Sequence, residues 1–206
     1  MTDPLRDAAD TMHTVRDRCV WTQQITHRDL VPYLVEESAE LIDAVEGGSR
    51  ADLREELGDL LWQVLFHAEI ASRDPDEPFD IDDVARGLTD KMVRRHPHVF
   101  ADAVATTPEE VLVLWNAAKA AEKSTRTSVL DGVSERMPSL ALAQKLLGKA
   151  TGVGIEVDGP PAASEEDLGD ALLALVATAR ANGWDAERAL RERLRSLEAE
   201  IRAAEA

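Results

Sequence analysis

The sequence is poor in the residues that build disulfides, β-strands and membrane spans. Its 206 residues include one cysteine, Cys19, which excludes an intrachain disulfide and favours a reducing compartment. Aromatic residues make up 4%, and β-branched runs are scarce beside abundant alanine and leucine, a composition that favours helices. No charged-then-apolar leader opens the chain, and no apolar run approaches the roughly 18 residues of a membrane span. We therefore expect an all-α cytoplasmic protein that does not act on membranes.

Basic residues are also few relative to acidic ones. Lys and Arg number 23 against 40 Asp and Glu, which gives a formal net charge of -17. Such a surface repels phosphate backbones, so nucleic-acid polymers are not expected partners. A smaller phosphate-containing ligand would need a local basic cluster, bound metal ions, or both.

Helix start and stop signals divide the chain into eight predicted helices. Examples are the capping box Ser49-x-x-Asp52 and the Pro108 that follows Thr107. The predicted helices cover about residues 4–18, 29–46, 50–72, 81–96, 108–123, 138–151, 165–181 and 186–204. The clearest boundary is the run 159–161, Gly-Pro-Pro. We accordingly expect one domain over residues 1–155 and a separate segment over residues 156–206.

The segment after this boundary resembles part of the first domain. Residues 166–170, Glu-Asp-Leu-Gly-Asp, repeat the pattern of residues 55–59, Glu-Glu-Leu-Gly-Asp. No acidic helix precedes the second copy, so half of the expected ligands are missing. We interpret residues 156–206 as a truncated repeat and predict that it binds no catalytic metal.

Two consecutive helices carry the most informative motif in the chain. An E-x-x-E pattern is followed after fifteen residues by E-x-x-D, with a further glutamate before each. A three-residue step places two side chains on one helical face, so an antiparallel pair would bring the motifs together. The candidate catalytic carboxylates are Glu36, Glu37, Glu40, Glu55, Glu56 and Asp59.

Helical periodicity places one of these carboxylates inside an apolar stripe. The second helix is predicted to bury Leu30, Leu34, Leu41 and Val45, with Glu37 in their midst. An anionic glutamate there costs several kcal/mol unless it is compensated. Hard oxygen ligands select Mg²⁺, with Mn²⁺ as the alternative. A ferritin-like oxidase would use Glu-x-x-His, which this sequence lacks, so magnesium-dependent phosphate chemistry is favoured.

The third helix is apolar on two faces. One predicted stripe contains Leu57 and Val64, whereas Trp62 and Phe66 fall on another face. Such a helix is buried on both sides, either by a partner subunit or by other helices of its own chain.

A phosphate substrate also requires cationic groups near the metal. Lys91, Arg94 and Arg95 lie in one short basic run, and Lys119 follows Trp115 by one helical turn. Grouped in an acidic chain, these side chains are candidates for a phosphate clamp. Trp115 or Trp21 is a candidate for stacking on a base, although core packing accounts equally well for either.

The ordered motifs resemble MazG and the wider family of all-α nucleoside triphosphate pyrophosphohydrolases. The resemblance rests on E-x-x-E and E-x-x-D in sequence with the runs 94–100, Arg-Arg-His-Pro-His-Val-Phe, and 130–133, Leu-Asp-Gly-Val, and covers about residues 5–155. It implies an antiparallel helix bundle, a homodimer, and Mg²⁺-dependent hydrolysis of nucleoside triphosphates to monophosphate and pyrophosphate, which serves nucleotide-pool housecleaning.

The resemblance also assigns residues. It implies metal ligands at Glu37, Glu40, Glu56 and Asp59, and nucleotide contacts at Lys91, Arg95, Trp115 and Lys119. The family's Cys-Pro-Trp-Asp run reads Cys-Val-Trp-Thr at residues 19–22. Either Glu36 or Glu55 is a candidate to accept the proton of the attacking water. A helical module that senses nucleotides without hydrolysing them is the alternative function.

Overall fold

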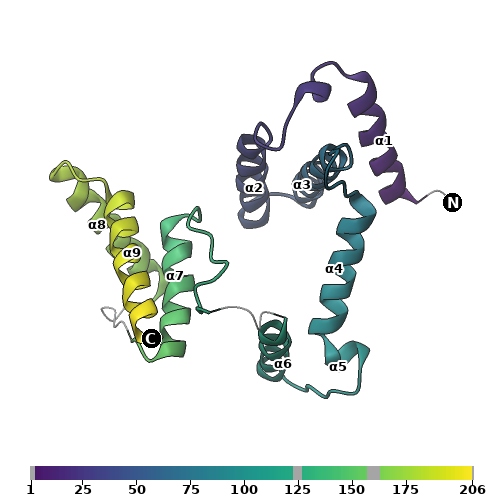
Figure 1. The fold of residues 1–206 in the computed structure, drawn as a ribbon. Helices are drawn as coiled ribbons and strands as arrows, with labels where there is room; N and C mark the ends of the chain where they lie inside the picture. The colour runs from purple at the N-terminus through teal and green to yellow at the C-terminus, as the bar shows by residue number, and fades with distance from the viewer. Residues whose placement is uncertain (1–2, 123–126, 157–162, 206) are drawn as a thin grey trace. The chain divides into compact units, whose positions relative to one another are not determined.

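The computed structural model describes residues 3–122, 127–156 and 163–205, and these residues form helices joined by turns and loops (Figure 1). The elements are α1 (Pro4–Arg18), η1 (Thr22–Gln24), α2 (Val31–Glu46), α3 (Arg50–Ala71), α4 (Ile81–Arg95), α5 (Pro97–Phe100), α6 (Pro108–Ala121), α7 (Ser139–Ala150), η2 (Thr151–Val153), α8 (Glu165–Ala181) and α9 (Ala186–Ala204). The described ranges contain no strand, which confirms the predicted all-α class.

Local capping explains why the helices begin where the sequence predicts. Ser49 accepts hydrogen bonds from the first turn of α3, and its own backbone N–H donates to the Asp52 carboxylate at 2.7 Å. Asp80 and Asp83 form the same reciprocal box at the start of α4. These bonds satisfy backbone groups that a helix leaves unpaired at its N-terminus. The short helix α5, which begins at Pro97, was not predicted.

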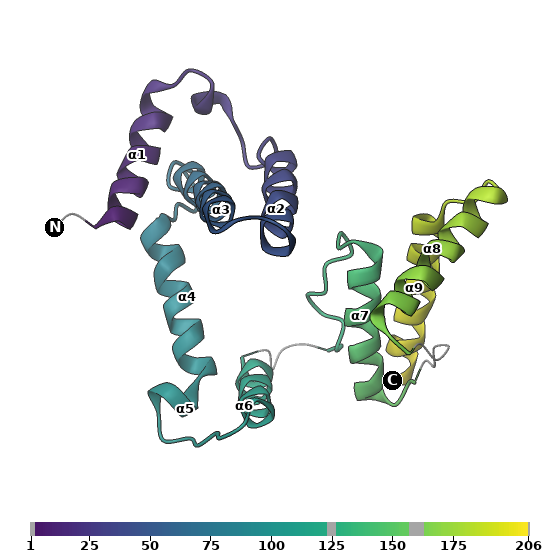
Figure 2. The ribbon, with the colours of Figure 1, turned by 180° about the vertical axis from the view of Figure 1, so that it is seen from behind.

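The chain divides into two compact units, Met1–Ala120 and Ala121–Ala206. In the first unit, α3 packs against both α1 and α2 (Figures 1 and 2). Its apolar core contains Met12, Leu30, Leu65 and Phe66. The turn between α2 and α3 is very tight: a Cβ atom at Gly48 would lie 2.7 Å from the Cα of Ala44, so glycine is needed there. The two helices consequently run antiparallel.

The core face of α3 differs from the predicted one. Phe66 is only 1% exposed, because α1 packs over this side of α3. The predicted stripe residues Leu57 and Val64 are instead 52% and 45% exposed. On α2, Leu34 and Val45 were also expected to be buried and are exposed. The apolar pattern identified both faces, but only the packing of α1 decides which one is covered within the protomer.

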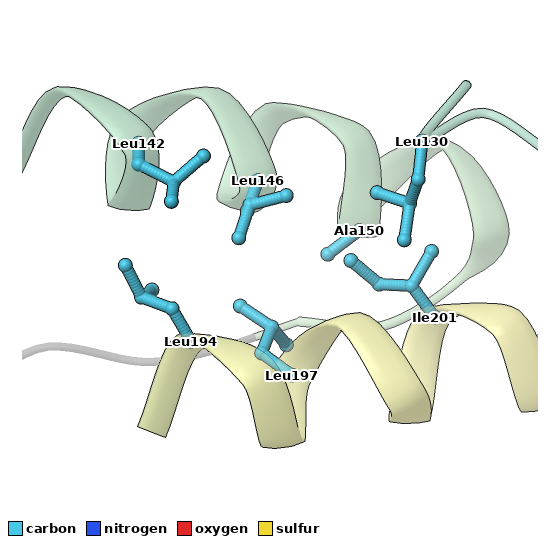
Figure 3. Close-up of a cluster of buried hydrophobic side chains, with 7 residues drawn as sticks. All are labelled: Leu130, Leu142, Leu146, Ala150, Leu194, Leu197 and Ile201. Carbon is cyan, nitrogen blue, oxygen red and sulfur yellow. The ribbon is translucent and has the colours of Figure 1, made fainter. Parts of the chain in front are cut away.

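The second unit has its own core between α7 and α9. Leu142, Leu146 and Ala150 face Leu194, Leu197 and Ile201 in the same order along both helices, which therefore run parallel (Figure 3). Helix α8, which lies between α7 and α9 in the sequence, returns the chain to the end at which α9 begins. The structural division thus falls before α7, earlier than the boundary expected after residue 155, because the leucines of α7 pack on α9. The Gly-Pro-Pro run at 159–161 lies outside the described residues, and the truncated repeat remains a prediction.

Among the helices described, none is both long and apolar enough to cross a membrane.

Candidate metal centre and nucleotide-binding residues

Three of the predicted carboxylates converge between α2 and α3. Glu37 projects from α2, and Glu56 and Asp59 lie one turn apart on α3. One oxygen from each residue lies within 4.8 Å of the others. The antiparallel hairpin produces this arrangement, because it places the middle of α2 beside the N-terminal half of α3. We call Glu37, Glu56 and Asp59 the carboxylate cluster.

The electrostatics of the cluster are unfavourable without a cation. Burial raises the pKa of Glu37, and the neighbouring charges of Asp59, Glu40 and Glu36 raise it further. Burial also raises the pKa of Glu56, again with support from surrounding carboxylates. Glu56 Oε2 is buried and has no hydrogen-bond partner among the residues described. A bound hard cation would relieve the repulsion between these carboxylates and would supply a partner for the unpaired oxygen.

The other predicted carboxylates surround the cluster. Glu40 is exposed, and with Glu56, Asp43 and Asp52 it lines a hollow at the α2–α3 turn. Its charge raises the pKa of both Glu37 and Glu56, so it lies near the three converging oxygens without being one of the closest set. Glu36 and Glu55 are exposed neighbours of the cluster in the chain.

One polar residue of the site was not identified as functional from the sequence. Gln63 on α3 is 5% exposed and donates a hydrogen bond to Glu37, which partly offsets the rise in that pKa. Its Oε1 atom is buried without a partner within the described ranges. Its spacing could have identified it. Gln63 follows Asp59 by four residues and Glu56 by seven, so the three side chains lie on the same face of α3.

Two of the predicted nucleotide-binding residues contact each other. The guanidinium carbon of Arg95, at the end of α4, lies 5.0 Å from the ring centroid of Trp115 on α6. The ring of His96 meets Trp115 edge-on at 5.1 Å. Arg95 is buried, and Trp115 is half-buried. This cation–π contact holds a planar cation and an aromatic face together, a combination suited to phosphate and base.

The remaining basic candidates lie on the same two helices. Lys91 is half-buried one turn before Arg95, and Arg94 is exposed beside it. Lys119 is half-buried one turn after Trp115. The residues that the resemblance assigns to nucleotide binding therefore all lie on α4 and α6.

Trp21, the other candidate for base stacking, lies in the loop after α1. It is 51% exposed and meets the ring of Tyr33 edge-on, with centroids 6.2 Å apart. Tyr33 precedes Glu37 by one turn of α2, so an exposed aromatic pair lies on the helix that carries the cluster.

A histidine contact was not foreseen. His67 on α3, interpreted as structural from the sequence, stacks on His27 with ring centroids 5.0 Å apart. Their Nδ1 atoms are 2.7 Å apart, so one donates a hydrogen bond to the other. Burial and the nearby His27 both lower the pKa of His67. The two residues are forty positions apart in sequence, which hides the contact from any spacing rule.

Comparison with known proteins identifies relatives that align with most of the chain. A family model described as the MazG nucleotide pyrophosphohydrolase domain matches residues 25–100, which include the carboxylate cluster. An uncharacterised 26.1 kDa protein of Streptomyces cacaoi is 50% identical over 98% of this chain and 82% of its own length. A nucleoside triphosphate pyrophosphohydrolase of Mycolicibacterium smegmatis is 41% identical, over 85% of this chain and 58% of that protein. The Escherichia coli K12 protein of the same name is 35% identical over 91% of this chain and 80% of its own length.

Proposed function

We propose that this chain, which belongs to the MazG family of nucleotide pyrophosphohydrolases, hydrolyses nucleoside triphosphates to the monophosphate and pyrophosphate. The carboxylate cluster carries the proposal, because it is the arrangement of oxygen ligands that such chemistry needs. The names of the Mycolicibacterium and Escherichia relatives support the reaction class. Housecleaning of the cytoplasmic nucleotide pool is the role that we propose for it.

The residues of the cluster fit a divalent metal ion. The closest donors are all carboxylate oxygens, no histidine or cysteine belongs to this described group, and Glu56 Oε2 is buried without a partner. Hard oxygen donors of this kind suit Mg²⁺ or Mn²⁺. We propose Glu37, Glu56 and Asp59 as ligands, with Glu40 as a fourth. When bound, the metal neutralises the triphosphate charge and makes water a stronger nucleophile.

The protein side chains accept the proton and bind the phosphates during the reaction. Water attacks the α-phosphorus, the bond from this phosphorus to the bridging oxygen of pyrophosphate breaks, and pyrophosphate departs. Glu36 or Glu55, both exposed beside the ligands, accepts the proton of the water. Arg95, Lys91 and Lys119 bind phosphate oxygens and stabilise the negative charge of the transition state.

Pyrophosphate release tests the activity. A panel of ribo- and deoxyribonucleoside triphosphates is incubated with the protein and Mg²⁺ or Mn²⁺, and pyrophosphate and orthophosphate are measured separately. We expect pyrophosphate and monophosphate from the wild-type protein and none after Glu37→Ala or Glu56→Ala. Undiminished metal-dependent release by both variants would refute the assignment. Tight nucleotide binding with no turnover of any substrate would instead favour a nucleotide sensor.

An exposed apolar surface supports a homodimer. The side chains of Leu57, Leu61 and Val64 on α3 lie at helical spacing and are 36–52% exposed, and Ile42 and Val45 on α2 are 55% and 67% exposed. Exposed apolar residues gathered on two adjacent helices are a feature of interfaces between subunits. We propose that α2 and α3 pack against their counterparts in a second copy.

Size-exclusion chromatography coupled to light scattering measures the mass of the particle and tests the dimer. We expect twice the chain mass for wild type and the chain mass for Leu61→Glu. Val104→Glu, at a separate position that is 81% exposed, is the control and should remain dimeric. A monomeric wild-type protein would exclude this assembly.

A further inference from the structure

We propose that Gln63 is a positioning residue of the metal centre, which fixes the Glu37 carboxylate and offers a buried oxygen to the hydration shell of the cation. The inference rests on the proposed function, since it concerns the same site. It adds a residue outside the E-x-x-E and E-x-x-D motifs to the machinery that binds the cation.

The first observation is the orientation of Gln63. Its side chain is 95% buried on the face of α3 that carries Glu56 and Asp59, and its amide donates a hydrogen bond to Glu37 across the helix pair. Glu37 is one of the three residues whose carboxylate oxygens converge within 4.8 Å. A neutral donor steadies this carboxylate without neutralising it. A lysine or arginine at this position would compete with the cation.

The second observation is the carbonyl oxygen of the same amide. Gln63 Oε1 is buried, and it has no hydrogen-bond partner in the part of the chain that the structure describes. A buried acceptor without a donor is costly, and it persists where a ligand supplies the donor. Mg²⁺ retains several water molecules when carboxylates bind it, and such waters are strong donors. The unpaired oxygen beside Glu37 is therefore placed to accept a hydrogen bond from one of them.

The alternative for a buried glutamine is plain core packing. Under that alternative, an apolar residue of similar shape preserves metal binding. Under the proposal it weakens metal binding. The fold stays intact, because loss of the donor to Glu37 and removal of the unpaired acceptor have opposite effects on stability. Metal affinity in the folded variant therefore distinguishes the two roles.

The experiment compares wild type with Gln63→Met by titration calorimetry, using MgCl₂ alone and the full-length protein stripped of metal with EDTA. Loss of an outer partner of a metal ligand typically weakens binding 10- to 100-fold, and we expect a loss in this range. A cooperative unfolding transition in EDTA verifies that the variant is folded. The control Gln24→Met replaces an exposed glutamine of η1 and should bind Mg²⁺ like wild type.

Pyrophosphate release gives a second measurement. We expect the Mg²⁺ concentration for half-maximal release to rise in Gln63→Met, with most of the kcat recovered at saturating Mg²⁺. If Gln63→Met fails to fold, Gln63→Asn keeps the amide but withdraws it by one methylene, and it should show the same weakening. Wild-type Mg²⁺ affinity in the folded variant would overturn the inference alone. A wild-type protein that binds no Mg²⁺ would instead refute the proposed function.

Discussion

The carboxylate cluster predicts that Glu37→Gln has opposite effects on stability with and without magnesium. In the metal-free protein, the substitution removes a charge that burial and three neighbouring carboxylates disfavour, so the unfolding temperature should rise. With Mg²⁺ present, the same substitution removes a ligand, so the unfolding temperature should fall below that of wild type. A residue that served only packing would shift stability in one direction under both conditions.

The size of the magnesium effect follows from mass action. At a free Mg²⁺ concentration of about 100 times Kd, binding stabilises the wild-type protein by about 2.7 kcal/mol. If Glu37→Gln weakens binding about 100-fold, the stabilisation at the same concentration falls to about 0.4 kcal/mol. For a chain of this size, 1 kcal/mol moves the unfolding temperature by about 3 °C, so the magnesium-induced rise should fall from about 8 °C to about 1 °C.

Tryptophan fluorescence is a suitable probe, because three of the four tryptophans lie in the first unit. Thermal unfolding is followed in EDTA and in excess Mg²⁺ for wild type, Glu37→Gln and the control Glu46→Gln. Glu46 is an exposed residue of the same helix outside the cluster, and its substitution should leave the magnesium response intact. A Glu37→Gln protein that keeps the full magnesium-induced rise would refute the role of this carboxylate.

Further predictions concern the core of the second unit, the histidine pair and the nucleotide contacts. Leu146 is 0% exposed, so Leu146→Ala should cost about 3 kcal/mol, measured by hydrogen exchange in α7 and α9, and pyrophosphate release should be unchanged. Folding lowers the pKa of His67, so the unfolded chain binds more protons near pH 6 and stability should decrease as pH falls below about 6.5. His27→Gln should reduce that decrease, measured as unfolding temperature against pH. Trp115→Leu removes the aromatic ring that Arg95 contacts and should raise KM for nucleotide about tenfold with a smaller change in kcat, because binding is lost rather than chemistry.

Local signals predicted the helices well because capping acts over only a few residues. Ser49 and Asp52 form the capping box that their spacing predicts, and α3 begins at the next residue, Arg50. Faces were harder to predict, since they depend on contacts between distant segments. Phe66 packs on α1 and His67 meets His27, and no spacing within α3 specifies either contact. The packing of α7 on α9 also depends on distant segments, as Leu146 is covered by a helix that begins forty residues later.

The carboxylate site shows how far the local sequence of an acidic motif determines a metal centre. On α3, Glu56 and Asp59 belong to a centre because α2 runs antiparallel beside them and contributes Glu37. On α8, Asp167 and Asp170 repeat the same three-residue step, and both are exposed. The described partner of α8 is α9, which brings no counterpart of the E-x-x-E motif. We therefore predict that this second pair of acidic residues stays solvated and binds no metal, since exposed carboxylates gain little from a cation that they hold from one side only. We propose that the helix hairpin, rather than either acidic motif, creates the metal centre, so an acidic motif without the first helix should not form the site.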